Sequence, residues 1–362
     1  MNESNIYRNA GYGEKLIEAI RNTITRPWRI MDTCGGQTFS IAKYRIEEML
    51  PDGITLIHGP GCPVCVTPSE TIDLAIDLAL NSNVIIVSFG DMLRVPGESN
   101  DLLTAKAMGG DIRTIYSPLD ALRIAEENPG KEVVLLAIGF ETTAPIHAQV
   151  VLEATKRNIR NLSLLTALFA VPPVLEALFA MPDFSVDGIL AAGHVCTITG
   201  LKEYERLAGQ YIIPIAVTGF EPVDILWGIY SNIKQLEKGD FHVDNAYSRM
   251  VPQEGNVKAR QALYEVFDIQ DQAWRGLGYL SGSGFRLKDR YASFDTMIRF
   301  GKMPPAILRD EICISGEIMK GNAKPEDCPN FGKKCHPSAP LGAPMVSSEG
   351  VCAAYFKYKI HE

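Results

Sequence analysis

Cysteines are the residues of this sequence with the greatest capacity for chemistry. Its 362 residues include eight of them, in an early group of three, a late group of four and one that stands alone: Cys34, Cys62 and Cys65; Cys313, Cys328, Cys335 and Cys352; and Cys196. This density is too low for a disulfide-stapled secreted scaffold. Residues 1–15 contain no apolar stretch of the kind that a signal peptide needs. We therefore expect a cytoplasmic protein, where grouped cysteines are more often catalytic or metal-binding than structural bridges.

Cys34 lies where the first predicted strand ends and a helix begins, in the sequence MDTCGGQT at residues 31–38. Ligands of open α/β sheets bind at such carboxyl ends of strands. Gly35 and Gly36 would let the backbone approach a ligand closely, and a helix N-terminus favours a thiolate over a thiol. A buried structural cysteine beside a tight turn explains this position equally well.

Cys62 and Cys65 form a Cys-x-x-Cys pair between the next predicted strand and a helix predicted from residue 69. Two sulfurs at this spacing can form a disulfide or bind one metal ion, and the helix terminus should lower a thiol pKa. Half of a zinc knuckle is an alternative, although no second Cys-x-x-Cys exists to complete it, and simple packing in a loop is another. We favour redox or metal chemistry. If the first two strands are neighbours, both cysteines converge with Cys34 on one crevice.

The four late cysteines are separated by 14, 6 and 16 residues in a segment rich in glycine and proline. Cys313, Cys328, Cys335 and Cys352 could bind an iron–sulfur cluster or a zinc ion. Zinc ribbons usually use paired Cys-x-x-Cys knuckles, which are absent here, so the spacing slightly favours a cluster. Two disulfides are a further alternative, which a reducing compartment disfavours.

Glu141 and His194 are weaker candidates for the same cleft. Each follows a predicted strand, in GFETT and GHV respectively, where a side chain can reach a ligand. A helix cap and a hydrogen-bonded loop histidine explain the two positions equally well. Cys196 has no partner in the sequence, and we interpret it as a packing residue.

The elements that must position these residues alternate between strands and helices. Several predicted strands are near-continuous runs of Val, Ile and Leu, as in sheets covered on both faces. Strands alternating with helical patterns indicate parallel sheets with right-handed crossovers. The predicted strands cover residues 28–33, 54–58, 84–88, 112–116, 133–138, 162–169, 188–192 and 212–217.

This series is too long for one comfortable sheet. A weak echo, Gly-Phe-Glu at residues 139–141 and again at 219–221, suggests two similar units. After residue 239 the apolar residues lose their regular spacing, and the glycine-rich residues 276–284 look like a loop. The end of this segment has too few apolar residues to form a large core, so we expect a metal centre or a similar cross-link to stabilise it. We therefore predict two parallel-sheet α/β domains and a cysteine-rich, loop-rich iron–sulfur domain, over residues 1–135, 136–238 and 239–362.

Composition excludes several other classes of protein. Hydrophobic residues make up 46% and charged residues 22%, which suits a globular core, and the net charge of −8 argues against nucleic-acid or anionic-membrane partners. The longest stretch without Asp, Glu, Lys or Arg, residues 161–175, is too short and too interrupted by proline to span a bilayer. No phosphate-binding signature of the P-loop or dinucleotide type is present.

The joint order of these motifs resembles the HypD family of [NiFe]-hydrogenase maturation factors over nearly the whole chain. The matching strings are CGGQT at 34–38, GPGCPVC at 59–65, GFETT at 139–143, GHV at 193–195, GFEP at 219–222, CISGEI at 313–318, DCPNFGKKC at 327–335 and MVSSEGVCAAY at 345–355. Each string alone is modest, but their shared order makes coincidence a poor explanation.

The resemblance implies a fold of two similar α/β domains and a third domain with a [4Fe-4S] cluster on the four late cysteines. It implies that Cys34 binds iron and that Cys62 and Cys65 are a redox pair. It also implies a small HypC-type chaperone as partner, with which the family forms the scaffold for the Fe(CN)2CO unit, and a HypE-type partner that delivers cyanide. Such a protein is a redox-active assembly scaffold rather than a conventional turnover enzyme.

One departure from the family pattern concerns the Cys34 loop. The family often has histidine at the positions of Gln37 and Phe39, so we expect no histidine of this loop to bind iron or move protons here. Two rival functions stay open: a thiol–disulfide oxidoreductase that uses Cys62 and Cys65, and a zinc-stapled α/β binding protein without redox chemistry.

Overall fold

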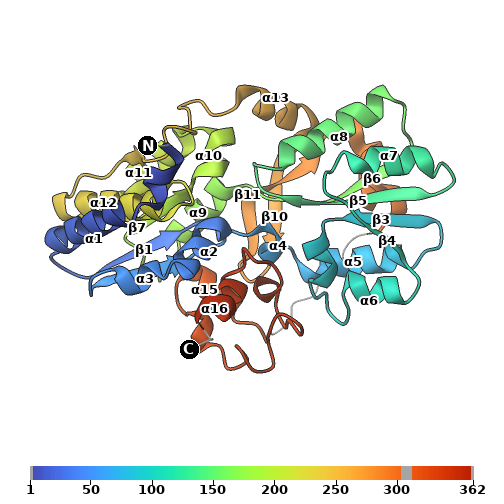
Figure 1. The fold of residues 1–362 in the computed structure, drawn as a ribbon. Helices are drawn as coiled ribbons and strands as arrows, with labels where there is room; N and C mark the ends of the chain where they lie inside the picture. The colour runs from blue at the N-terminus through green and yellow to red at the C-terminus, as the bar shows by residue number, and fades with distance from the viewer. Residues whose placement is uncertain (1–2, 303–311, 360–362) are drawn as a thin grey trace.

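The computed structural model describes residues 3–302 and 312–359. Within them, two α/β lobes lie side by side, each built on a parallel β-sheet, and the C-terminal segment packs below them in the view of Figure 1. The predicted fold class, α/β with two parallel sheets, is confirmed. Among these residues, no helix combines the length with the apolar character that crossing a membrane would require.

Sheet A takes its strands from two distant parts of the chain. Its order is β2-β1-β7-β8-β9, and all of its pairs are parallel. Asp32 on β1 lies opposite His58 on β2, so the first two strands are neighbours that end at the same level. The strands are β1 (Trp28–Asp32), β2 (Ile54–His58), β7 (Gly188–Ala192), β8 (Ile215–Thr218) and β9 (Val243–Asn245).

Sheet B consists of the strands between these two parts. Its order is β4-β3-β5-β6, again with parallel pairs. The two central strands are buried almost throughout, as their unbroken apolar runs predict. The strands are β3 (Val84–Ser88), β4 (Asp111–Thr114), β5 (Glu132–Gly139) and β6 (Leu162–Leu168).

The composition of the sheets differs from the predicted division at residue 135. Strand β5 runs across that boundary, and β6 pairs with it although β6 falls in the segment 136–238. The chain then returns to sheet A, where β7 pairs with β1. Apolar runs indicate where strands form. The strands of both sheets have similar apolar sequences, so these runs do not indicate which strands pair.

Helices cover sheet A on both faces. Helix α12 presents Ile225, Ile229 and Ile233 at intervals of four residues, and these side chains are buried in a cluster with Leu16 and Ile20 of α1. The helices of this lobe are η1 (Glu3–Arg8), α1 (Ala10–Thr23), α2 (Gly35–Lys43), α3 (Ile46–Met49), α10 (Gly193–Thr199), α11 (Lys202–Tyr211) and α12 (Pro222–Lys238).

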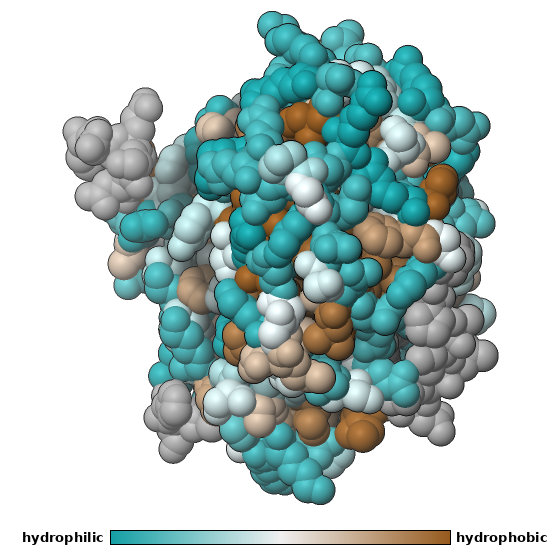
Figure 2. Space-filling view, turned by 90° about the vertical axis from the view of Figure 1, so that its right-hand side faces the viewer, coloured by the Kyte–Doolittle hydropathy of each residue, from teal (hydrophilic) through white to brown (hydrophobic). Residues whose placement is uncertain are grey.

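The second lobe is seen from its outer side in Figure 2, which shows a largely hydrophilic surface with scattered apolar patches. Its predicted helix from residue 69 is confirmed as α5. The helices here and in the connection to it are α4 (Pro63–Val66), α5 (Ser69–Ala79), η2 (Gly90–Arg94), α6 (Leu102–Ala107), α7 (Asp120–Glu127), α8 (Ala144–Lys156) and α9 (Val171–Phe179).

The part after residue 239 contains more regular structure than the sequence predicted. The glycine-rich stretch that looked like a loop enters strand β11, which pairs antiparallel with β10 and tolerates its glycines through a register shift and a left-handed Gly282 (φ 62°). Its elements are α13 (Val257–Val266), β10 (Phe267–Trp274), β11 (Gly278–Leu287), η3 (Asp289–Phe294), α14 (Thr296–Phe300), α15 (Ser315–Lys320), η4 (Pro325–Asp327), η5 (Ala343–Met345) and α16 (Val351–Lys359).

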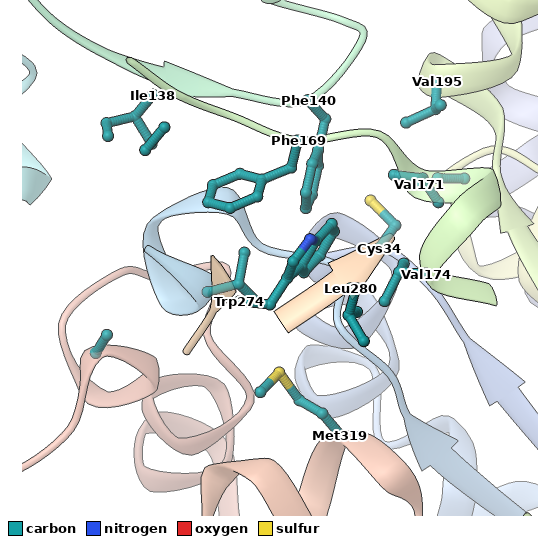
Figure 3. Close-up of a cluster of buried hydrophobic side chains, with 14 of the residues drawn as sticks. Cys34, Ile138, Phe140, Phe169, Val171, Val174, Val195, Trp274, Leu280 and Met319 are labelled. Carbon is teal, nitrogen blue, oxygen red and sulfur yellow. The ribbon is translucent and has the colours of Figure 1, made fainter. Parts of the chain in front are cut away.

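One apolar core joins both lobes and the hairpin. The Trp274 ring lies 4.8 Å from the ring centroid of Phe169 and 5.9 Å from that of Phe140, and Met319 of α15 belongs to the same buried cluster. Figure 3 shows this cluster with Cys34 among its side chains. The hairpin is thus part of the shared core, whereas the cysteine-rich residues 312–359 are mostly loops and short helices.

Candidate functional site

Cys34 is the N-cap residue of α2, at the carboxyl end of β1. Its sulfur accepts a hydrogen bond from the backbone N–H of Gly36 (3.3 Å), and only 3% of the residue is exposed. Burial raises the pKa of its thiol to about 12. Desolvation outweighs the backbone hydrogen bonds of Gln37 and Gly36 at the helix terminus, which lower the thiol pKa as expected, so the net shift is upward. A bound cation would be needed to hold the thiolate.

The loop that contains Cys62 and Cys65 lies directly against the Cys34 loop. The N–H of Gly35 donates to the carbonyl of Gly61 (2.9 Å), and a Cβ atom on Gly61 would lie 2.4 Å from the Cα of Cys34. Only glycine permits this approach. The predicted convergence of the two loops is present, because its condition, the pairing of β1 with β2, is met.

Cys62 and Cys65 are joined by a disulfide in the structure, with their Cα atoms 5.2 Å apart. Cys62 is the N-cap of α4, and its sulfur also accepts from the N–H of Cys65. Only 4% of Cys62 and 3% of Cys65 are exposed. A macromolecular thiol therefore cannot reach this disulfide without opening the loop, whereas a group bound within the crevice could.

His194 follows β7 and reaches Cys34 from the neighbouring strand. Its Nδ1 atom lies 3.7 Å from the Cys34 sulfur, and its ring packs against Phe220 with the centroids 5.2 Å apart. Burial lowers the pKa of His194 to about 4, so the imidazole is neutral at pH 7. The structure thus supplies, from another strand, an imidazole that the Cys34 loop itself lacks.

Gln37, in place of the family's frequent histidine, has a structural role. Its side-chain amide donates to the carbonyl of Ala191 (3.1 Å) and to the Thr218 hydroxyl (2.6 Å). These contacts tie the start of α2 to the ends of β7 and β8, and the residue is fully buried. Phe39 packs its ring edge-on against Tyr358 of α16, with centroids 5.4 Å apart.

Glu141 makes its contact with α9 rather than with Cys34. Its Oε1 atom accepts a hydrogen bond from the N–H of Val171 (2.8 Å), at the first residue of that helix. Its Oε2 atom is buried and has no hydrogen-bond partner among the described residues. Burial raises the pKa of Glu141 to about 7. Cys196 is fully buried in the shared core.

The four late cysteines line one apolar pocket. Burial raises the pKa of Cys352 well above its usual value, and the nearby thiols of the other three raise it further. A Cβ on Gly342 would lie 2.3 Å from the Cys313 sulfur, so this glycine makes room for the thiol. The pocket is lined by Cys313, Cys328, Cys335 and Cys352 together with Ile312, Ile314, Ser315, Ile318, Asn330, Phe331, Leu341, Gly342, Pro344 and Met345.

The four thiols and their apolar surroundings are a donor set that suits an iron–sulfur cluster. An iron–sulfur cluster is a wider body that takes one thiolate at each iron, so its four sulfurs stand further apart than the ligands of one zinc ion. Four thiols around an apolar pocket match that arrangement.

Glu349 is a residue of the site that sequence reasoning missed. A Cβ on Gly35 would lie 2.4 Å from its carbonyl oxygen, so the C-terminal segment closes directly on the Cys34 loop. Its carboxylate also adds to the rise in the pKa of Cys34. Nearby, the Ser347 hydroxyl donates to Asp91 of η2 (3.3 Å). The string MVSSEG was visible in the sequence, but nothing in its residues indicated contact with residue 35.

Fold and site together define an α/β protein with a buried thiol beside a buried disulfide. The model of the family described as "HypD: Hydrogenase formation hypA family" matches residues 12–359. Hydrogenase maturation factor HypD of Escherichia coli (strain K12) is 41% identical over 364 residues, which cover 98% of this chain and 98% of that protein. Hydrogenase maturation factor HypD of Rhodobacter capsulatus is 41% identical over 349 residues, 95% of this chain and 93% of that protein. This chain belongs to the HypD family and functions in hydrogenase maturation.

Proposed function

We propose that this protein, with a small HypC-type chaperone in the cytoplasm, holds an iron ion at Cys34 while cyanide and carbonyl ligands are attached to form the Fe(CN)2CO unit. One observation carries this proposal: the Cys34 loop and the Cys62–Cys65 loop are buried and touch at Gly61. This contact supports a scaffold for reductive ligand transfer, which needs an iron site and a source of two electrons side by side.

The iron is the substrate of this site, and the buried Cys34 thiol loses its proton only when a cation binds to it. A thiol with a pKa of about 12 is protonated at pH 7, so the proton leaves when a cation takes its place. Thiolate is a soft donor that suits iron with carbon ligands. Neutral His194, 3.7 Å from the sulfur, can hydrogen-bond to it without adding charge.

Cys62 and Cys65 supply the electron pair for cyanide release. A HypE-type partner presents cyanide as a thiocyanate, R–S–C≡N. The two thiolates become a disulfide, the S–C bond of the thiocyanate breaks, and R–S⁻ and CN⁻ leave. One S–S bond forms for each S–C bond broken, so atoms and electrons balance. The disulfide in the structure corresponds to the oxidised state of this pair.

Cys313, Cys328, Cys335 and Cys352 would hold a [4Fe-4S] cluster in their apolar pocket. When bound, such a cluster supplies single electrons at low potential. The apolar lining would limit the access of water to such a cluster, and η5 and α16 contact α4 and α2 respectively. The C-terminal segment thus lies next to both early cysteine loops.

The Cys62–Cys65 disulfide also favours a second candidate, a thiol–disulfide oxidoreductase. Such enzymes need an exposed attacking sulfur to reach a protein disulfide. Here both sulfurs belong to residues that are at most 4% exposed. Burial therefore favours an oxidant that is bound in the site, such as the thiocyanate that the HypE-type partner presents, over a protein disulfide that approaches from solvent.

Replacing Cys34 tests the proposal. Cys34→Ala, purified with the HypC-type partner, should lose the cyanide and carbonyl infrared bands of the complex while the fold and the late-cysteine absorbance persist. Cys34→Ser should behave in nearly the same way, because a neutral hydroxyl is a poor donor to such an iron. Cys196→Ala, a change at another buried cysteine, is the matched control and should keep the bands. Full-strength bands in Cys34→Ala would contradict the assignment.

A further inference from the structure

A line of buried polar side chains connects the Cys34 loop to the C-terminal helix. We call Asp32, His58, Tyr355 and Glu47 the Tyr355 network. Asp32 Oδ2 lies 2.5 Å from His58 Nδ1, and His58 Nε2 lies 2.7 Å from the Tyr355 hydroxyl. The same hydroxyl donates to Glu47 Oε2 (2.9 Å). Asp32, His58 and Tyr355 are 1%, 4% and 0% exposed, so water cannot replace these contacts.

Three of the four members of the network, Asp32, His58 and Tyr355, lie close in sequence to a group of the proposed function. Asp32 precedes Cys34 by two residues, and its second oxygen accepts a hydrogen bond from Thr38 of α2 (2.6 Å). His58 begins the loop that leads to Cys62. Tyr355 follows Cys352 by one turn of α16, so its hydroxyl is placed by the same helix that contributes a cysteine to the late-cysteine pocket.

The hydrogens of these groups satisfy every contact of the network only when all of its members are in place. Tyr355 has one hydroxyl hydrogen, which it gives to Glu47, so its oxygen can only accept from His58. The contact between Asp32 and the other ring nitrogen also holds one hydrogen. His58 thus joins Asp32 to Tyr355, and each lost partner would leave a buried group unsatisfied.

The outer end of the network is fixed by charge. Glu47 on α3 also contacts Lys359 of α16 and lies 3.6 Å from Lys324 in the segment before η4. Its pKa is lowered, because the charges of His58 and Lys359 outweigh its burial. Glu47 thus stays ionised as an acceptor for Tyr355, and α16 is held in one position relative to β1 and β2.

We infer that Tyr355 is a positioning residue that couples the seating of the late-cysteine pocket to the arrangement of the Cys34 and Cys62–Cys65 loops. The inference rests on the proposed function in one respect: that function makes Cys34, Cys62 and Cys65 the thiols whose arrangement matters. When α16 is seated, Tyr355 satisfies His58, His58 orients Asp32, and Asp32 fixes the turn before Cys34. When α16 moves, His58 loses its contact with Tyr355 and the turn before Cys34 loses its anchor.

Tyr355→Phe removes one hydroxyl and keeps the ring, so it tests the coupling directly. The expected result is alkylation of Cys34 by iodoacetamide about tenfold faster than in the wild type, as the loss of one buried hydrogen bond would allow. The rate is followed residue by residue by mass spectrometry on the full-length protein. Tyr358→Phe is the matched control on the same helix, because Tyr358 packs its ring on Phe39 outside the network; it should leave the rate unchanged.

Two further measurements separate positioning from a general loss of structure. The ¹⁵N spectrum of His58 should change in Tyr355→Phe and not in Tyr358→Phe. In the wild type, removal of the cluster by chelation under oxidising conditions should speed Cys34 alkylation, because α16 loosens. In Tyr355→Phe the rate should be the same with and without the cluster. If Tyr355→Phe only damaged the structure, chelation would still raise the Cys34 alkylation rate of this variant further.

Should Tyr355→Phe fail to fold, Glu47→Leu tests the same network from its partly exposed outer end and should speed alkylation in the same direction by a smaller factor. Cys34 alkylation within twofold of the control in folded variants would overturn the coupling. The thiol rates need neither iron nor the partner. If Cys34→Ala keeps the infrared bands while Tyr355→Phe still speeds Cys34 alkylation, only the proposed function is refuted. If Cys34→Ala loses the bands while Tyr355→Phe leaves the alkylation rate unchanged, only the coupling is refuted.

Discussion

At the scale of single residues, burial decides the chemistry of this protein more than local helix geometry does. Cys34 is an N-cap residue, a position that by itself favours a thiolate. Desolvation nevertheless raises its thiol pKa to about 12 and lowers the pKa of nearby His194 to about 4. Both groups are therefore neutral at pH 7. A neutral pair of this kind leaves no stranded charge at this buried position.

Glu141 should give the stability of the protein a pH dependence of its own. Its pKa is about 7 when folded against an ordinary value of 4.5, so between these pH values the native state binds more protons than the unfolded state. Stability then falls as pH rises through this window and levels off above it, by about 3 kcal/mol in all. Urea denaturation at pH 5 and pH 8 should show a flatter profile for Glu141→Gln. Glu18→Gln, an exposed change, should keep the wild-type slope.

Cys62 and Cys65 should interconvert reversibly between dithiol and disulfide. Their Cα separation of 5.2 Å suits a disulfide, and their sequence spacing needs no backbone rearrangement to form one. Titration in defined thiol buffers, followed by alkylation and mass spectrometry, should give one two-electron transition for the pair. Fully buried Cys196 should stay unmodified throughout. A pair that never oxidises, or that retains a metal through the titration, would refute the cycle.

At the scale of elements, the pairing of β1 with β2 brings the two early loops together. The residues that follow these strands meet because the strands end at the same level, and Gly61 then lies on the backbone of Cys34. Neither loop could take this conformation if the strands were separated by a third. The same ends of β7 and β8 add His194 and Phe220, so the crevice is a property of sheet A rather than of one loop.

Gly61→Ala should therefore disturb both loops at once. The new methyl group would lie 2.4 Å from backbone atoms of Cys34, which cannot move aside as a flexible side chain could. We expect a loss of about 1–3 kcal/mol in the free energy of unfolding, as for overpacked cores. Urea denaturation measures it. Gly130→Ala is the control, because no atom lies within 4 Å of the position that its new methyl group would take. Equal stability of the two variants would show that the loops separate easily.

At the scale of the whole molecule, the region after residue 239 has two parts with different sources of stability. The β10–β11 hairpin is held in the shared apolar core through Trp274. Residues 312–359 are mostly loops and short helices around the cysteine pocket, so a bound cluster should contribute much of their folding energy.

Cys328→Ala should separate these two parts. It should abolish the broad absorbance near about 400 nm that thiolate-bound iron–sulfur clusters show. Limited proteolysis should then cut within residues 312–359, while both lobes and the hairpin stay intact. Cys196→Ala should keep the absorbance and the protection. Stoichiometric zinc in anaerobically purified wild-type protein, or a tail equally protected without its metal centre, would count against a cluster-dependent segment.

The sequence alone was enough to predict strands β1 to β8 and the class of fold, but not strands β9 to β11. Buried parallel strands consist of continuous apolar runs, so β3 and β5 could be located from local composition. The cysteines could be grouped because their spacing limits what they can bind, and the joint order of the motifs indicated the family. These properties depend on neighbours along the chain, which is why they could be predicted without the tertiary structure.

Only the tertiary structure decided how these parts combine. The pairing of β1 with β7 joins residues about 160 positions apart, and no local pattern distinguishes that edge from those of sheet B. The high pKa of Cys34 and the contact of Tyr355 with His58 likewise depend on groups brought from distant segments. Desolvation and strand pairing depend on all the groups that surround a residue in space. Most of these groups are distant in the sequence, so a local sequence pattern does not identify them.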